Sequence, residues 1–255
     1  MRSHADLPMP LSAHLEELRG RLIKIVLAIG VGFALCYNWA DLVFAFLTHP
    51  LILIKPEDAI FIGTGVPEAF FTKLKVSLIA GVFLTSPVIL FQVWRFIAPG
   101  LYANERRYAI SFVFFGTLCF FLGAAFCYQV IFSVGFQFFL GEYASMGVTP
   151  TLRISEYLSF AARLLLAFGL TFEMPVLTFF LARLGLVTAA GIIASWRYAM
   201  VGIFVVAAIL TPADVASQLL MAGPLITLFG ISIGVAYLAQ PKDTTEAAHP
   251  EEPSE

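Results

Sequence analysis

Two glutamates with basic neighbours stand where long apolar runs give way to polar sequence. Glu17 is followed by Arg19 and by Arg21, which is four residues away and can pair with Glu17 along a helix face, and Glu105 is followed directly by Arg106. Solvated surface charge is the ordinary explanation for such acids, because exposed ion pairs contribute little to stability. Two carboxylates on one face would also suit a ligand with two guanidinium groups, since arginine–carboxylate pairs are bidentate and directional. Both explanations stay open at this stage.

A third acid, Glu173, lies within an apolar run and is followed by Pro175. A carboxylate at membrane depth is costly unless it is neutral, hydrated or paired, so it faces an interior or a cavity. Pro175 leaves a nearby backbone carbonyl without its helical donor, which adds polarity. Glu173 is therefore either a polar site for a partner group or a structural hydrogen bond between helices. Arg163 lies ten residues earlier, about 15 Å along a helix, and is expected to be an interface anchor.

Motifs of enzymes and metal sites are missing from the sequence. It contains no GxxxxGK[ST] phosphate loop, no HExxH and no GxSxG, and its four histidines lie far apart. The three cysteines include no CxxC pair, which indicates neither a disulfide framework nor a zinc site. We therefore expect a protein that is not an enzyme and that needs no cofactor or metal.

The composition is that of an integral membrane protein. Of 255 residues, 60% are hydrophobic and only 13% are charged, whereas soluble domains have about 25% charged residues. The chain is long enough for about six spans of about 20 residues with short connections. We predict an all-α membrane protein, with six transmembrane helices in a concave bundle.

The apolar pattern divides the chain into three parts. Residues 1–21 are predicted to form a cytoplasmic amphipathic segment at the membrane interface, residues 22–238 the transmembrane domain, and residues 239–255 a disordered tail. The connection 41–73 is too apolar for a flexible linker and is expected to hold a short amphipathic segment that caps the bundle, and 133–154 is expected to be an external loop. The six spans are predicted at residues 22–40, 74–94, 108–132, 155–181, 197–210 and 216–238.

The fifth predicted span, 197–210, is too short for a normal bilayer. It reaches about 21 Å against a hydrocarbon core of about 30 Å, so we expect it to thin the membrane locally. Ten lysines and arginines fall on one side of the predicted spans and four on the other. The positive-inside rule then puts both termini in the cytoplasm.

Several segments together resemble the TatC family, the polytopic receptor subunits of the twin-arginine protein translocase. They occur in the order of that family and extend over most of the chain. The matching segments are HLEELRGRL from His14, SP from Ser86, QVW from Gln92, FIAPGLY from Phe96, ERR from Glu105, FEMP from Phe172 and LTPAD from Leu210.

The resemblance implies a receptor in a bacterial cytoplasmic membrane, associated with further copies of itself. Such a receptor binds twin-arginine signal peptides of folded cargo and no nucleic acid. TatA- and TatB-type single-span partners then help to move the cargo, driven by the proton-motive force. By position, Glu17 and Glu105 would receive the arginine pair, and Glu173 would meet a polar residue of a partner. The other implied residues are Arg19, Phe96, Pro99 and Tyr102 for signal-peptide binding, Gln92 for the intramembrane site, and Pro50 and Asp214 for further roles.

Two other functions stay open from the residues alone. The first is a proton- or ion-coupled secondary transporter that uses Glu173, and the second is a scaffold that collects membrane partners. A transporter should show paired repeats with broken helices in both halves. Only the predicted span 155–181 carries such an acid, and no second copy of it is visible.

Overall fold

The chain folds almost entirely into helices. The computed structural model describes residues 11–55, 60–97, 106–211 and 215–240. The helices are α1 (Leu11–Tyr37), α2 (Ala40–Ile54), α3 (Glu68–Ile97), α4 (Arg106–Phe126), the π-helical turn η2 (Cys127–Ile131), α5 (Phe132–Ser145), α6 (Ile154–Arg183), α7 (Ala189–Ala194), α8 (Trp196–Leu210) and α9 (Val215–Ala239). Two short parallel strands, β1 (Ile60–Ile62) and β2 (Thr151–Arg153), complete the described structure.

Five helical stretches within the described residues are long and apolar enough to cross a membrane. The predicted all-α membrane fold is therefore confirmed, with α8 as the short additional helix at 15 residues. The five long stretches are Leu15–Tyr37, Glu68–Phe96, Ile110–Ser145, Ile154–Arg183 and Val215–Ala239.

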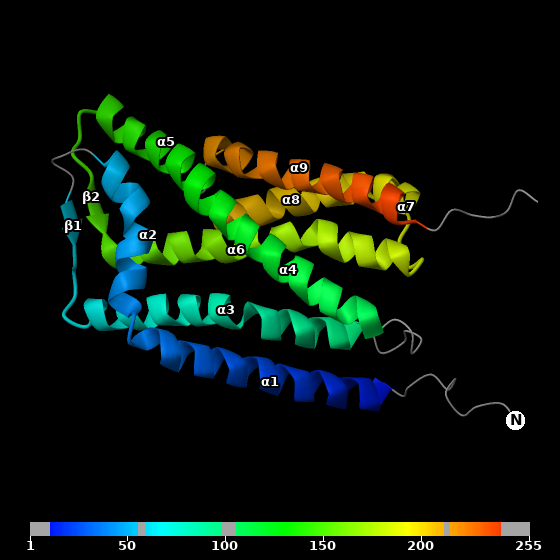
Figure 1. Ribbon diagram of the computed structural model, residues 1–255. Coiled ribbons are helices and arrows are strands. Elements are labelled where there is room, and N and C mark those ends of the chain that lie inside the picture. Colours follow the sequence, from blue (N-terminus) through cyan, green and yellow to red (C-terminus); the bar gives the residue numbers. More distant parts are fainter. Residues whose placement is uncertain (1–10, 56–59, 98–105, 212–214, 241–255) are drawn as a thin grey trace, which may run out of the picture.

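The long helices run side by side, as Figure 1 shows. Helix α1 packs on α3, and α9 packs on α6 and α8, while the continuous unit α4–η2–α5 crosses α3 and α6 diagonally. We call the end of the bundle with β1 and β2 the β end. The opposite end, where α1 begins and α9 ends, is the terminal end. Both described ends of the chain therefore lie on the same side of the bundle.

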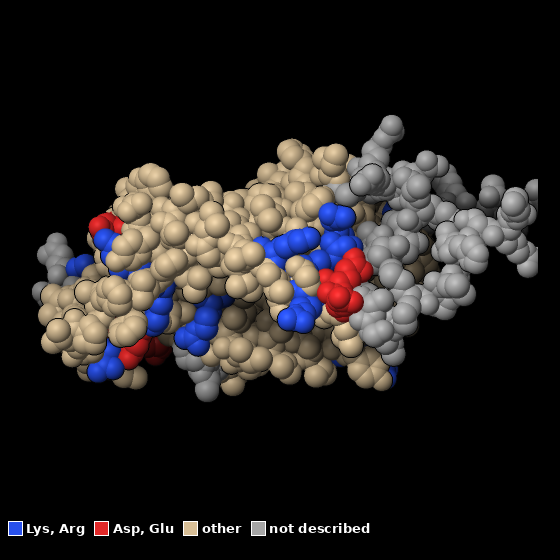
Figure 2. Space-filling model, turned by 90° about the horizontal axis from the view of Figure 1, so that it is seen from below, with Lys and Arg blue, Asp and Glu red and all other residues tan. Residues whose placement is uncertain are grey.

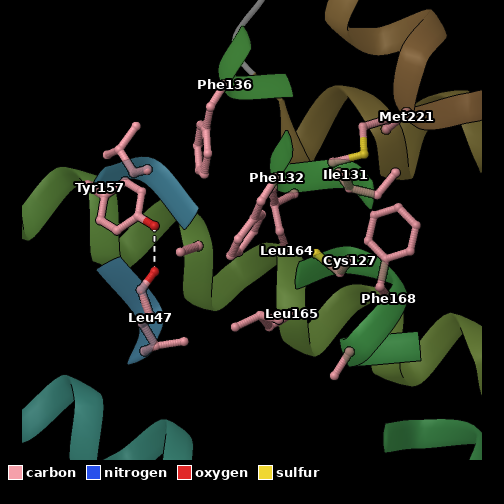
Figure 3. Close-up of a cluster of buried hydrophobic side chains, with 14 of the residues drawn as sticks. Leu47, Cys127, Ile131, Phe132, Phe136, Tyr157, Leu164, Leu165, Phe168 and Met221 are labelled. Atoms are coloured by element: carbon pink, nitrogen blue, oxygen red, sulfur yellow. Dashed lines mark hydrogen bonds between the residues drawn. The ribbon is translucent and has the colours of Figure 1, made fainter. Parts of the chain in front are cut away.

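The main hydrophobic core lies where α6 meets η2, α5 and α9 (Figure 3). Phe132 and Phe168 are almost fully buried there, next to Leu164 and Cys127. A smaller aromatic cluster joins α3, α4 and α6 nearer the terminal end; its members are Leu90, Trp94, Phe112, Val176 and Phe180. These two clusters hold α6 at the centre of the bundle.

Helix α2 lies across the β end and is held there by two tyrosines. Pro50 inside α2 has no N–H to give to the carbonyl of Phe46, four residues earlier. The Tyr128 hydroxyl of η2 donates to that carbonyl at 2.8 Å. The Tyr157 hydroxyl of α6 donates to the next carbonyl, that of Leu47, at 2.6 Å (Figure 3). The proline therefore frees an acceptor that fastens α2 to the rest of the bundle.

Some boundaries differ from the sequence prediction. Residues 11–21, part of the predicted amphipathic segment, are the first turns of α1. The expected loop 133–154 is helical as far as Ser145, because the π-turn η2 lets the helix continue without a break. The pairing of β1 with β2 was not predicted, since three-residue strands are too short to show an alternating pattern. Of the predicted tail, residues 241–255 lie outside the described structure.

Candidate functional site

Helices α1 and α3 touch through two glycines. A Cβ atom on Gly32 would come 2.7 Å from the carbonyl oxygen of Gly81, and one on Gly81 would come 2.6 Å from the nitrogen of Phe33. Both distances are shorter than side chains tolerate, so the two backbones pack directly on each other. The helices run in opposite directions (Figure 1), and this contact therefore fixes their register.

That register brings the first predicted binding acid level with the end of α3. Glu17 precedes Gly32 by 15 residues, and Phe96 follows Gly81 by 15 residues. At 1.5 Å per residue, both lie about 22 Å from the glycine contact, at the terminal end. The other predicted signal-peptide residues, Pro99, Tyr102 and Glu105, follow Phe96 in the chain and lie outside the described residues.

The carboxylate of Glu17 is partly engaged by its own helix. Arg21 donates from Nε to Oε1 of Glu17 at 3.0 Å and also from Nη2 to the same oxygen, which is the predicted pair four residues apart. Within the described part of the chain, the other oxygen, Oε2, accepts no hydrogen bond. Arg19 lies two residues from both Glu17 and Arg21, and its side chain is exposed. Glu17 thus keeps one oriented oxygen for another cation.

The last turn of α3 rests on the smaller aromatic cluster. The Trp94 ring stacks on Phe112 with centroids 4.5 Å apart and meets Phe180 edge-on at 5.1 Å. Trp94 is buried, whereas Phe96 is half-buried and Arg95 is exposed. Figure 2 shows that charged side chains of both signs gather toward the two ends of this face of the molecule. The end of α3 is therefore a rigid support next to a charged surface.

Glu173 lies in the interior, between α3, α4 and α6. Its side chain is only 2% exposed, and neither carboxylate oxygen has a hydrogen-bond partner within the described residues. A Cβ atom on Gly116 of α4 would come 3.0 Å from Oε2. Glu173 also lines a cavity of about 280 Å³ that includes Ser86 and Leu90 of α3. A buried carboxylate without donors is costly, so an incoming polar group would be stabilised here.

Gln92 does not share that cavity. Gly81 and Thr85 of α3 both lie against Gly32 of α1. Gln92 is seven residues after Thr85 and therefore lies on the same face of α3. The residues of α3 that line the Glu173 cavity lie on another face, and Gln92 is not among them. Its side-chain oxygen is buried and has no partner within the described residues. The structure therefore places Gln92 and Glu173 in separate surroundings.

Two of the predicted residues remain, Pro50 and Asp214. Pro50 is buried in α2 at the β end, far from the terminal end, and Asp214 lies outside the described residues. Sequence reasoning missed Gly81 and Gly116. Glycine within an apolar helix costs about 1 kcal/mol relative to alanine, so its presence there can indicate a close contact between helices. The described residues contain no group of three His, Cys, Asp or Glu side chains that could hold a metal ion.

Comparisons with known proteins agree with this arrangement. The family model for the Sec-independent protein translocase protein (TatC) matches residues 13–224. The Sec-independent protein translocase protein TatC of Desulforapulum autotrophicum is 43% identical over 238 residues, covering 93% of this chain and 88% of that protein. The protein of the same name from Azotobacter chroococcum mcd 1 is 42% identical over 254 residues, covering 100% and 98%.

A solved structure is also similar. The crystal structure of the twin arginine translocase receptor TatC superposes with a TM-score of 0.81 at 38% identity, covering 89% of this chain and 99% of that chain. The region matched by the family model contains Glu17, Glu105, Glu173 and Asp214.

Proposed function

Because the chain belongs to the TatC family of Sec-independent protein translocase proteins, we propose that its terminal end captures the twin-arginine signal peptide of a folded cargo protein. The family makes the chain a receptor component of the twin-arginine translocase and a multi-pass membrane protein. Such a component is not an enzyme, as the sequence predicted, and the secondary-transporter alternative has no support from the family. The glycine contact that sets Glu17 level with Phe96 carries the proposal.

Glu17 would receive one guanidinium group of the arginine pair. Arg21 holds Oε1, so the carboxylate is already oriented when the peptide arrives, and Oε2 accepts the guest's hydrogen bonds. Hydrogen bonds between ionised groups are strong, and a fixed acceptor loses little entropy on binding. Glu105, eight residues beyond the end of α3, is the proposed acceptor for the second arginine.

Four further residues would shape the surface around this pair. Phe96, half-buried on the last turn of α3, offers an apolar contact, and Arg19 on α1 adds an exposed cation beside Glu17. Pro99 and Tyr102 belong to the connection that follows α3 and are assigned here from the family resemblance alone.

Glu173 would bind a polar side chain of a TatA- or TatB-type single-span helix. The support is its burial with two unpartnered oxygens beside a cavity of about 280 Å³ between α3 and α6. Hydrogen bonds between membrane helices contribute about 1–2 kcal/mol in model peptides, enough to favour one helix position over another. Gln92 and Asp214 would take part in separate contacts, and Pro50 would act by holding α2.

The terminal end would face the cytoplasm of a bacterial cell, with the cytoplasmic membrane around the bundle. The excess of lysine and arginine on that side supports this orientation, ten against four. The family resemblance implies that the cargo would cross under the proton-motive force, and the lack of a GxxxxGK[ST] phosphate loop in the sequence is consistent with this. Short α8 would thin the bilayer beside α9 and lower the barrier to passage.

Photo-crosslinking of a twin-arginine peptide to the full-length chain in membranes tests the proposal. We expect Glu17→Ala and Glu105→Ala each to abolish most crosslinking to the terminal end while the protein still inserts. Glu16→Ala is the matched control, because Glu16 is an exposed acid on the same turn that has no bond to Arg21. Undiminished crosslinking in the double variant Glu17→Arg, Glu105→Arg would refute the proposal.

A further inference from the structure

Two cations at the β end, Lys75 and Arg163, form no ion pair with an acid among the described residues. Lys75 of α3 donates from Nζ to the hydroxyl of Ser159 at 3.0 Å, and Arg163 of α6 donates from Nε to the carbonyl of Ser159 at 3.1 Å. The ion pairs within the described residues are Arg21–Glu17, Lys73–Asp41 and Arg153–Glu156. Lys75 and Arg163 therefore converge on one serine, and their charges are not neutralised by a carboxylate of the described chain.

Both side chains line a cavity of about 520 Å³ between α3 and α6. Glu156 also lines it, but the Arg153 guanidinium donates to that carboxylate at 2.8 Å, and this bond raises the pKa of Arg153. The nearby Glu68 accepts hydrogen bonds from the backbone at Thr64 and Ser155. The other lining residues are the serines Ser155 and Ser159 and the aromatic residues Tyr157 and Phe160, of which Tyr157 is buried. The cavity thus combines two uncompensated cations with aromatic surface.

The position along the helices corresponds to a membrane boundary. Helices α3 and α6 each have 30 residues, about 45 Å, so each extends about 7 Å beyond each face of a centred hydrocarbon core of about 30 Å. Lys75 lies about 10 Å from the start of α3 and Arg163 about 13 Å from the start of α6. The bond from Arg163 to Ser159 directs the guanidinium one turn outward, toward the headgroups.

We propose that this cavity binds the phosphodiester of a membrane phospholipid at the β end, with Lys75 and Arg163 holding the phosphate oxygens. A guanidinium group matches phosphate geometry, and basic pockets between transmembrane helices bind lipid headgroups. The half-buried ring of Phe160 favours a lipid over inorganic phosphate, because it can cover the first carbons of the acyl chains. The bound lipid would add a further link between α3 and α6 beside the bonds from Lys75 to Ser159 and from the Ser155 N–H to Glu68.

Native mass spectrometry of the full-length chain in detergent, titrated with a short-chain phosphatidylglycerol, tests this site. We expect saturable binding of one lipid. The affinity should fall about thirtyfold in the double variant Lys75→Gln, Arg163→Gln, since each positive charge contributes about a factor of five to the affinity. Lys73→Gln is the matched control: Lys73 lies two residues away but is paired with Asp41, and binding should be unchanged. Arg163→Lys retains the charge and should bind within about threefold of the parent chain.

Three further arms distinguish the sources of the phosphate and guard against misfolding. Thermal unfolding of each variant in detergent should match the parent chain, so that weaker binding reflects the site. A diacylglycerol without phosphate should not bind, and inorganic phosphate should not displace the lipid at equal concentration. Equal binding by the double variant, equal binding of the diacylglycerol, or displacement of the lipid by inorganic phosphate would each overturn the proposal.

Discussion

The carboxylate of Glu173 lies against the α carbon of Gly116. A Cβ atom on Gly116 would come 3.0 Å from Oε2 and 3.5 Å from Oε1, so the acid of α6 occupies the space that a side chain of α4 would fill. Leu90 of α3 borders the same position at 3.3 Å. The place of the proposed partner-binding acid therefore depends on a residue that carries no functional group.

Gly116→Ala should lower the free energy of unfolding only while the acid is present. Overpacking costs about 1–3 kcal/mol, against a gain of about 1 kcal/mol from replacing glycine by alanine in a helix. In a Glu173→Ala background the contact with the carboxylate disappears, and the Leu90 methyl group at 3.3 Å can shift into the space left by the acid, so the same substitution should be stabilising. Thermal unfolding in detergent measures both, with Gly135→Ala, which would meet no atom within 4 Å, as the control. An equal effect in the two backgrounds would show that the contact does not exist.

Pro50 and Tyr128 should be energetically coupled. Tyr128→Phe keeps the ring that stacks on Phe46 but leaves the Phe46 carbonyl without its donor, which should cost about 1–3 kcal/mol. With Pro50→Ala, the new backbone N–H pairs with that carbonyl within the helix, and the cost of Tyr128→Phe should fall below about 1 kcal/mol. A double-mutant cycle on unfolding free energies checks this, and strict additivity would contradict it.

The α1–α3 contact should govern capture of the signal peptide. Gly32→Ala forces the two backbones apart, with an expected loss of about 1–3 kcal/mol in stability and reduced peptide crosslinking near Glu17. Gly30→Ala, two residues away with open space around it, is the matched control and should keep full crosslinking. Both quantities can be measured on the same membrane preparations. Indistinguishable behaviour of the two alanine variants would mean that this contact does not set the register.

Helix α8 should protect a shorter stretch from water than its neighbours do. Its 15 residues reach about 22 Å, whereas the hydrocarbon core of a normal bilayer is about 30 Å thick. A cysteine-labelling scan along α8 should show reactive positions closer together in sequence than a scan along α9, which has 25 residues. If every position of residues 197–210 is protected as in a full span, the proposed thinning is absent.

Local features could be predicted from the sequence because their partners are near in the chain. The Glu17–Arg21 pair follows from a spacing of four on a helix, and the shortness of α8 follows from the length of its apolar run. The short capping segment expected within 41–73 corresponds to helix α2, since that connection is too apolar for a loop in water. Each of these predictions needed only a window of a few turns.

Features that depend on distant segments could not be predicted. The contacts of Gly81 with α1 and of Gly116 with Glu173 join residues on different helices, and one sequence does not show which helices are neighbours. The helix as far as Ser145 was expected to be a loop because its glycines and polar residues are typical of loops. Gln92 was assigned to the Glu173 site by resemblance, and only its place on α3 showed that it faces α1.

The central claim is that Glu17 bonds directly to an arginine of the signal peptide. Its most direct test is a double-mutant cycle on peptide binding to the full-length chain, combining Glu17→Gln with replacement of one peptide arginine by glutamine. Hydrogen bonds between charged groups predict a coupling energy of about 1.5–3 kcal/mol for one of the two arginines. Coupling energies near zero for both arginines would contradict the account.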